Sequence, residues 1–243
     1  MTTYAFCAPI LPGKTDVGKE LTTLLRGDYK SDAERLRREA GLDREQVFIQ
    51  STPMGDVAIV VWDTENFDKV VDVFAKDGSD FGKWFRSKLM EIHGFDISDV
   101  ANAPKLEIGY EWTDTSWSFG DFEAGTVCFP LKPGMTDTIL SWAKELSGPR
   151  NGDFVRTRGE LGIKRQLFIL QRTPQGDFAI MYGEGKPNWL AGGYEVNSTS
   201  TEPFFVWFRE SLQALSAAPL FAGGPAPKLE RIFEMTVRTP VKA

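Results

Sequence analysis

The chain's single histidine, His93, and Arg86, seven residues before it, are the side chains best suited to acid–base and anion chemistry. Both fall in a predicted helix, where this spacing, nearly two turns, puts them on one side. An imidazole can move protons near neutral pH, and a guanidinium can hold a carboxylate or phosphate. His93 and Arg86 are therefore the catalytic candidates. The alternative is a helix-end imidazole whose cationic form the helix dipole favours, beside a solvated arginine.

A second set of residues could line a ligand pocket between a sheet and its helices. Arg231 is the charged member, because it falls on an otherwise apolar face of a predicted strand, where a charge needs a partner or a ligand. The aromatic members are otherwise explained as plain core, since their spacing is that of helices and strands. The predicted ligand-binding residues are Trp62, Trp84, Tyr110, Tyr182, Trp207 and Arg231.

Cysteines and glutamates also recur at matched places. Cys7 and Cys128 lie on predicted first strands, where a buried thiol is usually structural and a nucleophile would need a neighbouring base. Four glutamates on predicted last strands either converge inside a barrel, where desolvation raises the carboxyl pKa, or guard a strand edge, which we favour. They are Glu107, Glu111, Glu230 and Glu234. With one histidine and no closely spaced cysteine pair, we expect no metal and no cofactor.

These residues recur because the sequence is duplicated. CAPILPGKTD at Cys7 is echoed by CFPLKPGMTD at Cys128, an offset of 121 residues. At the same offset, residues 35–59 match residues 156–180 at 12 of 25 positions without a gap. The offset becomes 123 for FGKWFRSKL and FFVWFRESL, so two residues are inserted before the last helix of the second copy. The chain is therefore two copies of one unit.

The hydrophobic period changes in the same order within each copy. In the first copy it predicts strands at 4–9, 47–51, 56–62 and 106–112, with helices after the first strand and before the fourth. That order defines an α+β fold class of two tandem ferredoxin-like βαββαβ repeats, each a four-stranded sheet with helices on one face. The predicted domains are repeat 1 (1–112), a polar linker (113–124) and repeat 2 (125–237).

The composition of the chain limits the classes of partner that we expect. The net charge of −6 and the lack of a basic cluster argue against nucleic acid. No apolar run is long enough to span a bilayer and no leader is evident, so we expect a cytoplasmic protein without a membrane partner. A small-molecule ligand is the expected partner. The duplication makes the chain an internal pseudo-dimer, and further homo-oligomerisation is left open.

With its duplicated unit and its motifs FxxWFRxxL at Phe81 and TPxGD at Thr52, the chain resembles the dimeric α/β barrel superfamily. This superfamily includes antibiotic biosynthesis monooxygenase-like proteins and haem-degrading monooxygenases. The resemblance implies that the two ferredoxin-like repeats form an intramolecular dimeric α/β barrel. In haem-degrading relatives a helix with Phe, Trp, Ser and His supplies the iron ligand, and Phe81, Trp84, Ser87 and His93 are similar to that pattern.

The resulting hypothesis is a small-molecule enzyme or binding protein that acts on a modest, largely apolar ligand in a pocket between sheet and helices. A haem protein using His93 and a non-catalytic scaffold are the alternatives. Because Ser216 stands at the place of His93, and Arg231 at that of Ile108, we expect any site to differ between the copies. We also expect no haem, since His93 lies on a helix flank directly before Gly94, where water reaches it.

Overall fold

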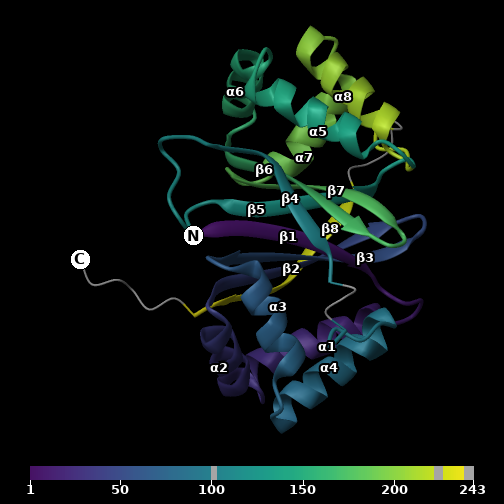
Figure 1. The fold of residues 1–243 in the computed structure, drawn as a ribbon. Coiled ribbons are helices and arrows are strands. Elements are labelled where there is room, and N and C mark those ends of the chain that lie inside the picture. Colours follow the sequence, from purple (N-terminus) through teal and green to yellow (C-terminus); the bar gives the residue numbers. More distant parts are fainter. Residues whose placement is uncertain (100–102, 222–226, 238–243) are drawn as a thin grey trace. The chain divides into compact units, whose positions relative to one another are not determined.

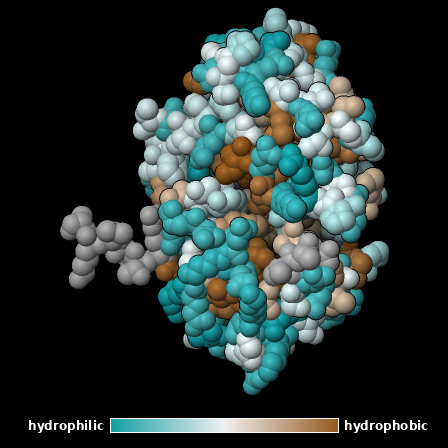
Figure 2. Space-filling model, viewed as in Figure 1, coloured by the Kyte–Doolittle hydropathy of each residue, from teal (hydrophilic) through white to brown (hydrophobic). Residues whose placement is uncertain are grey.

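The computed structural model describes residues 1–99, 103–221 and 227–237. The strands among these residues form two antiparallel sheets of four strands each, and helices cover one face of each sheet (Figure 1). The surface in view is mainly hydrophilic, with apolar residues in small patches (Figure 2). The α+β class predicted from the hydrophobic periods is confirmed.

Both copies contain the same elements in the same order. The first copy runs through β1 (Thr2–Pro9), α1 (Thr15–Arg26), α2 (Lys30–Ala40), β2 (Leu42–Thr52), β3 (Gly55–Thr64), α3 (Phe67–Lys76), α4 (Asp80–His93) and β4 (Lys105–Thr113). The second runs through β5 (Glu123–Pro130), α5 (Thr136–Ser147), α6 (Asn151–Glu160), β6 (Ile163–Thr173), β7 (Gly176–Gly185), α7 (Trp189–Thr199), α8 (Pro203–Leu215) and β8 (Lys228–Thr236). This repetition confirms the tandem ferredoxin-like duplication.

The helices α3 and α7 were not predicted from the sequence. In α3 the buried residues Phe67, Val70 and Phe74 recur at helical spacing. The helix begins where the side chain of Asn66 accepts a hydrogen bond from the backbone N–H of Lys69 at 2.9 Å. The pattern was therefore present, but the segment is short and follows a strand directly.

The copies exchange their last strands. One sheet has the order β1-β3-β2-β8 and the other β4-β6-β7-β5, so the fourth strand of each copy completes the sheet of the other. The compact units are accordingly residues 1–104 with 228–243, called unit 1, and residues 105–227, called unit 2. The predicted division at 1–112, 113–124 and 125–237 follows the duplication but not these units. The sequence pattern of a strand is the same whichever sheet it joins, which is why the exchange was not foreseen.

Each exchanged strand carries a β-bulge at the same place. The register of β8 against β2 skips Ile232, and that of β4 against β6 skips the matching residue, Gly109. A β-carbon on Gly109 would lie 2.8 Å from Cδ1 of Phe168 and 3.3 Å from the β-carbon of Ala143. Glycine is needed in β4 because the aromatic ring of Phe168 occupies that space.

We predict that Gly109→Ala lowers the free energy of unfolding by about 1–3 kcal/mol, since the added methyl group overpacks the contact with Phe168. Unit 1 has Val47 at the position that matches Phe168. In a Phe168→Val background, Gly109→Ala should therefore lower the free energy of unfolding by less. A double-mutant cycle measured by urea unfolding gives the coupling. If the two effects were additive, the ring of Phe168 would not be what excludes a side chain at position 109.

Candidate functional site

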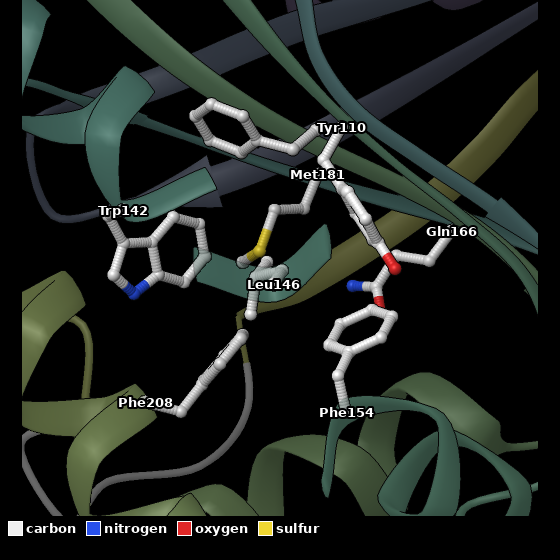
Figure 3. A pocket seen from close by; sticks show the side chains of 8 residues that line it. Tyr110, Trp142, Leu146, Phe154, Gln166, Met181 and Phe208 are labelled. Carbon is white, nitrogen blue, oxygen red and sulfur yellow. The ribbon is translucent and has the colours of Figure 1, made fainter. Parts of the chain in front are cut away.

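Unit 2 has a small pocket between its sheet and its helices (Figure 3). It contains about 200 Å³ of unoccupied space, part of it open to solvent, and its enclosed part has room for about one water molecule. Figure 3 shows Trp142 and Phe208 on one side and the polar ends of Tyr110 and Gln166 beside Phe154 on the other. The lining residues are Tyr110, Trp142, Leu146, Phe154, Gln166, Phe168, Met181 and Phe208.

The lining comes from both copies of the repeat. Trp142 and Leu146 lie one turn apart on α5, and Gln166 and Phe168 alternate on β6, so each pair faces the same way. Tyr110 arrives on β4, the strand contributed by the first copy. Burial raises the pKa of Tyr110, so its phenol stays protonated at neutral pH and keeps an O–H to donate.

A buried arginine contacts three of the lining residues. Arg158 on α6 is only 2% exposed, and its Nη1 donates a hydrogen bond to Oε1 of Gln166 at 3.1 Å. Its guanidinium carbon lies 4.6 Å from the ring centroid of Phe154 and 5.0 Å from that of Phe208. Among the described residues, its Nε and Nη2 have no hydrogen-bond partner. Burial lowers the pKa of Arg158 to about 10, so the group is still cationic at neutral pH.

The matching arginine of unit 1, Arg37, is fully compensated. Its Nε donates to Oε2 of Glu45 at 2.8 Å, its Nη2 pairs with the same oxygen, and its Nη1 donates to the carbonyl of Ala33 at 3.0 Å. The indole of Trp62 donates to the other oxygen of Glu45 at 2.8 Å. The second copy has Gln166 in place of Glu45 and Gly183 in place of Trp62. Unit 2 therefore keeps the buried cation, and no residue that the structure describes replaces its counter-ion.

A second polar atom of the pocket is also left without a partner. Trp142 is buried, and within the described part of the chain nothing accepts a hydrogen bond from its Nε1. Buried polar groups normally find partners, so such atoms need an explanation. In Figure 3 this nitrogen lies on the side of its ring away from Tyr110 and Gln166, so the donors at the polar end of the pocket are those of Tyr110 and Gln166, with Arg158 beside them.

The two predicted catalytic residues belong to unit 1 and do not line this pocket. Nη1 of Arg86 donates to the carbonyls of Phe74 and Asp77, at 3.2 and 2.8 Å, and so holds the end of α3. His93 is half-buried, with Nδ1 2.8 Å from the carbonyl oxygen of Pro9. Burial lowers the pKa of His93, so the expectation of an imidazole whose cationic form is favoured is wrong. Desolvation outweighs the opposing effect of the hydrogen bond to the carbonyl of Pro9.

Of the predicted ligand-binding residues, Tyr110 lines the pocket and Trp207 lies next to it, stacked on Trp142 at 6.1 Å between ring centroids. Trp62 and Trp84 belong to unit 1, where Trp84 stacks on Tyr29 at 4.0 Å. Tyr182 neighbours the lining residue Met181 on β7 and so points to the opposite face of the sheet. Its hydroxyl donates to Glu184.

Arg231 does not occupy an apolar face. Its side chain is 43% exposed and pairs with Glu234 at 2.8 Å, because the β-bulge at Ile232 shifts the alternation of β8. The inference that its charge needs a ligand is therefore wrong. The other predicted glutamates are likewise paired on the edge strands: Glu107 with Arg172, Glu111 with Arg165 and Glu230 with Lys19.

Arg158, Gln166 and Trp142 were missed in the sequence. The signal was available in the comparison of the copies, where the arginine is kept and its acidic partner is replaced.

Both cysteines are buried. In the described ranges, no group of histidine, cysteine and acidic residues could hold a metal ion, and no helix is long and apolar enough to cross a membrane.

We predict opposite stability effects for the same substitution at the two arginines. Arg37→Met should lower the free energy of unfolding by about 3 kcal/mol or more, because it strands the buried carboxylate of Glu45. Arg158→Met should be neutral or stabilising, because it removes a buried charge that has no counter-ion. Urea unfolding of both variants measures this. Equal losses in the two variants would mean that Arg158 is compensated after all.

Comparisons with known proteins support the fold. No family model and no curated protein matches the chain. Among solved structures, an anthrone oxidase-like protein superposes with a TM-score of 0.55 at 12% identity, over 99% of this chain and 94% of that one. A protein from Fusobacterium nucleatum subsp. nucleatum, named a "putative monooxygenase", superposes with a TM-score of 0.52 at 11% identity, over 96% and 93% of the two chains. The chain thus shares the tandem ferredoxin-like fold of these proteins, as its resemblance to the dimeric α/β barrel superfamily implied.

Proposed function

We propose that this chain is a small-molecule enzyme or binding protein whose ligand occupies the sheet–helix pocket of unit 2. The observation that carries the proposal is the lining itself. Aromatic and aliphatic side chains surround a few polar groups that approach from one side, which is the usual composition of a ligand site. The ligand is accordingly modest in size and largely apolar.

The pocket must widen to admit such a ligand, because its enclosed part holds about one water molecule. Met181 is the lining residue best suited to move, since its unbranched thioether has several rotatable bonds and is only half-buried. In unit 1 the polar end of the matching region is already filled by the pair of Arg37 and Glu45 with the indole of Trp62. We therefore assign the site to unit 2 alone.

The names of the two structural neighbours, an anthrone oxidase-like protein and a "putative monooxygenase", suggest the reaction class to test first. Oxidation of the bound organic molecule is that class. A scaffold without a ligand is the contrary case, and it predicts that no small molecule occupies the pocket.

The haem alternative has one observation in its favour. The carbonyl of Pro9 can hold Nδ1 of His93, which would leave Nε2 for a metal, as is common for ligating histidines. The pocket described here lies in the other unit, and its enclosed part is far too small for a porphyrin. The residues do not fit haem, and we expect no Soret band to develop when haemin is added to the purified protein.

Occupancy of the pocket can be tested with 4-fluorobenzoate and 4-fluorobenzamide, followed by fluorine NMR. We expect at least one of them to bind, and Met181→Phe to abolish that binding by filling the pocket. Val60→Phe makes the same change at the matching half-buried position of unit 1 and should leave binding intact. Circular dichroism verifies that both variants fold. The proposed function is contradicted if Met181→Phe leaves the affinity unchanged, or if neither compound binds the wild-type protein.

A separate prediction concerns pH. The pKa of His93 is lower in the folded protein than in the unfolded chain, where it is about 6.5, so the unfolded chain binds more protons in acid. The free energy of unfolding should therefore be highest above about pH 6.5 and fall as the pH drops below it. His93→Gln should remove this component, which unfolding curves at pH 7.5 and 5 would show. A wild type that loses no more stability than the variant between these pH values argues against it.

A further inference from the structure

We propose that the ligand of unit 2 is an organic acid, and that its carboxylate is the missing counter-ion of Arg158. This inference rests on the proposed function, because it assigns a chemical class to the ligand of the same pocket. Arg158 is buried and cationic, and the residues that line the pocket include no aspartate or glutamate.

The two units provide an internal comparison of the guanidinium edges. In Arg37 the edge formed by Nε and Nη2 binds Glu45, and Nη1 binds a backbone carbonyl. In Arg158 it is again Nε and Nη2 that find no partner in the described parts of the chain, while Nη1 donates to Gln166. The edge that accepts a carboxylate in unit 1 is thus the edge left empty in unit 2. A guanidinium edge of this kind matches the two oxygens of a carboxylate.

A purely structural arginine would need its counter-ion equally in both copies. Losing one partner of a buried ion pair costs about 3–5 kcal/mol, whereas replacing the whole pair by apolar residues is often harmless. The second copy has lost the carboxylate and still has the arginine. That combination is unfavourable for stability alone, and it is accounted for if a ligand brings the carboxylate.

The other polar groups fit the same ligand. Oε1 of Gln166 faces Arg158, which leaves the amide nitrogen of Gln166 turned toward the cavity in Figure 3. The protonated phenol of Tyr110, whose oxygen lies beside Gln166 in Figure 3, is a further donor. A ligand with acceptor oxygens at its acidic end and an aromatic or aliphatic body would pair with these donors and pack against Phe154 and Phe208.

The test compares the same two probes, because 4-fluorobenzoate and 4-fluorobenzamide have nearly the same shape and differ in charge. At pH 7 we expect the acid to bind wild-type protein at least ten times more tightly than the amide. Arg158→Met should reduce the affinity for the acid to that for the amide, and leave the amide unchanged. Fluorine NMR titrations give all four dissociation constants.

Gln166→Glu is the sharper variant, because it restores the counter-ion that unit 1 has. It should stabilise the protein, so loss of folding does not confuse the result, and it should abolish the preference for the acid while the amide still binds. Glu45→Gln makes the reverse exchange in unit 1; it should lower the free energy of unfolding but, as folded protein verified by circular dichroism, leave the preference unchanged.

The outcomes separate the two proposals. Equal affinity for acid and amide in wild type, or a preference that survives both Arg158→Met and Gln166→Glu, overturns the assignment of an organic acid and leaves the pocket intact as a ligand site. If neither probe binds in a manner sensitive to Met181→Phe, the proposed function fails, and this inference fails with it.

Discussion

Exchange of the last strands is the constraint on which the rest of this structure depends. β2 and β6 would each present an open row of backbone donors and acceptors if no fourth strand covered them. In both sheets the cover comes from the other copy, so neither copy can complete its sheet by itself. The same exchange brings Tyr110 of the first copy into the pocket of the second, and it imposes glycine at position 109 beside the ring of Phe168.

Each unit has a buried arginine at the same place in the repeat, but the residues around that arginine differ between the two units. In unit 1 the guanidinium of Arg37, the carboxylate of Glu45 and the indole of Trp62 satisfy one another and close the space. In unit 2 the arginine persists, Gln166 stands in place of the glutamate, and Gly183 stands in place of the tryptophan with the ring of Trp189 packed against it. Stability selects for a closed network, whereas a ligand site needs an open one. Within a single chain, one copy can retain the first and the other can develop the second.

The likeness to solved structures has a definite scope. Identities of 11 and 12% with nearly complete coverage of both chains show a common arrangement of strands and helices. A fold of this kind hosts many unrelated reactions, and chemistry is decided by the side chains in the pocket. For this chain the proposed function follows from the lining of the pocket, and the class of ligand follows from Arg158 beside it; the neighbours suggest only the reaction class to test first.

The sequence by itself determined the duplication, the α+β class and the order of most elements. These features depend on local period and on repeated motifs, and both are visible along the chain. It also indicated Tyr110 as a pocket residue and the edge position of the strands that carry the recurring glutamates. Short-range patterns did not separate α3 and α7 from the strands before them, because each helix begins within a few residues of the end of a strand.

Only the tertiary structure decided which sheet each last strand joins, since β4 and β8 have the same pattern in either pairing. It also decided burial: Arg231 is exposed because a bulge shifts its strand, and Arg158 is buried although its neighbours on α6 are mostly polar. Whether an arginine is compensated depends on residues that are distant in sequence or on other elements. That is why the sequence called attention to Arg86 and Arg231, and why the uncompensated charge of Arg158 emerged only from the packed molecule.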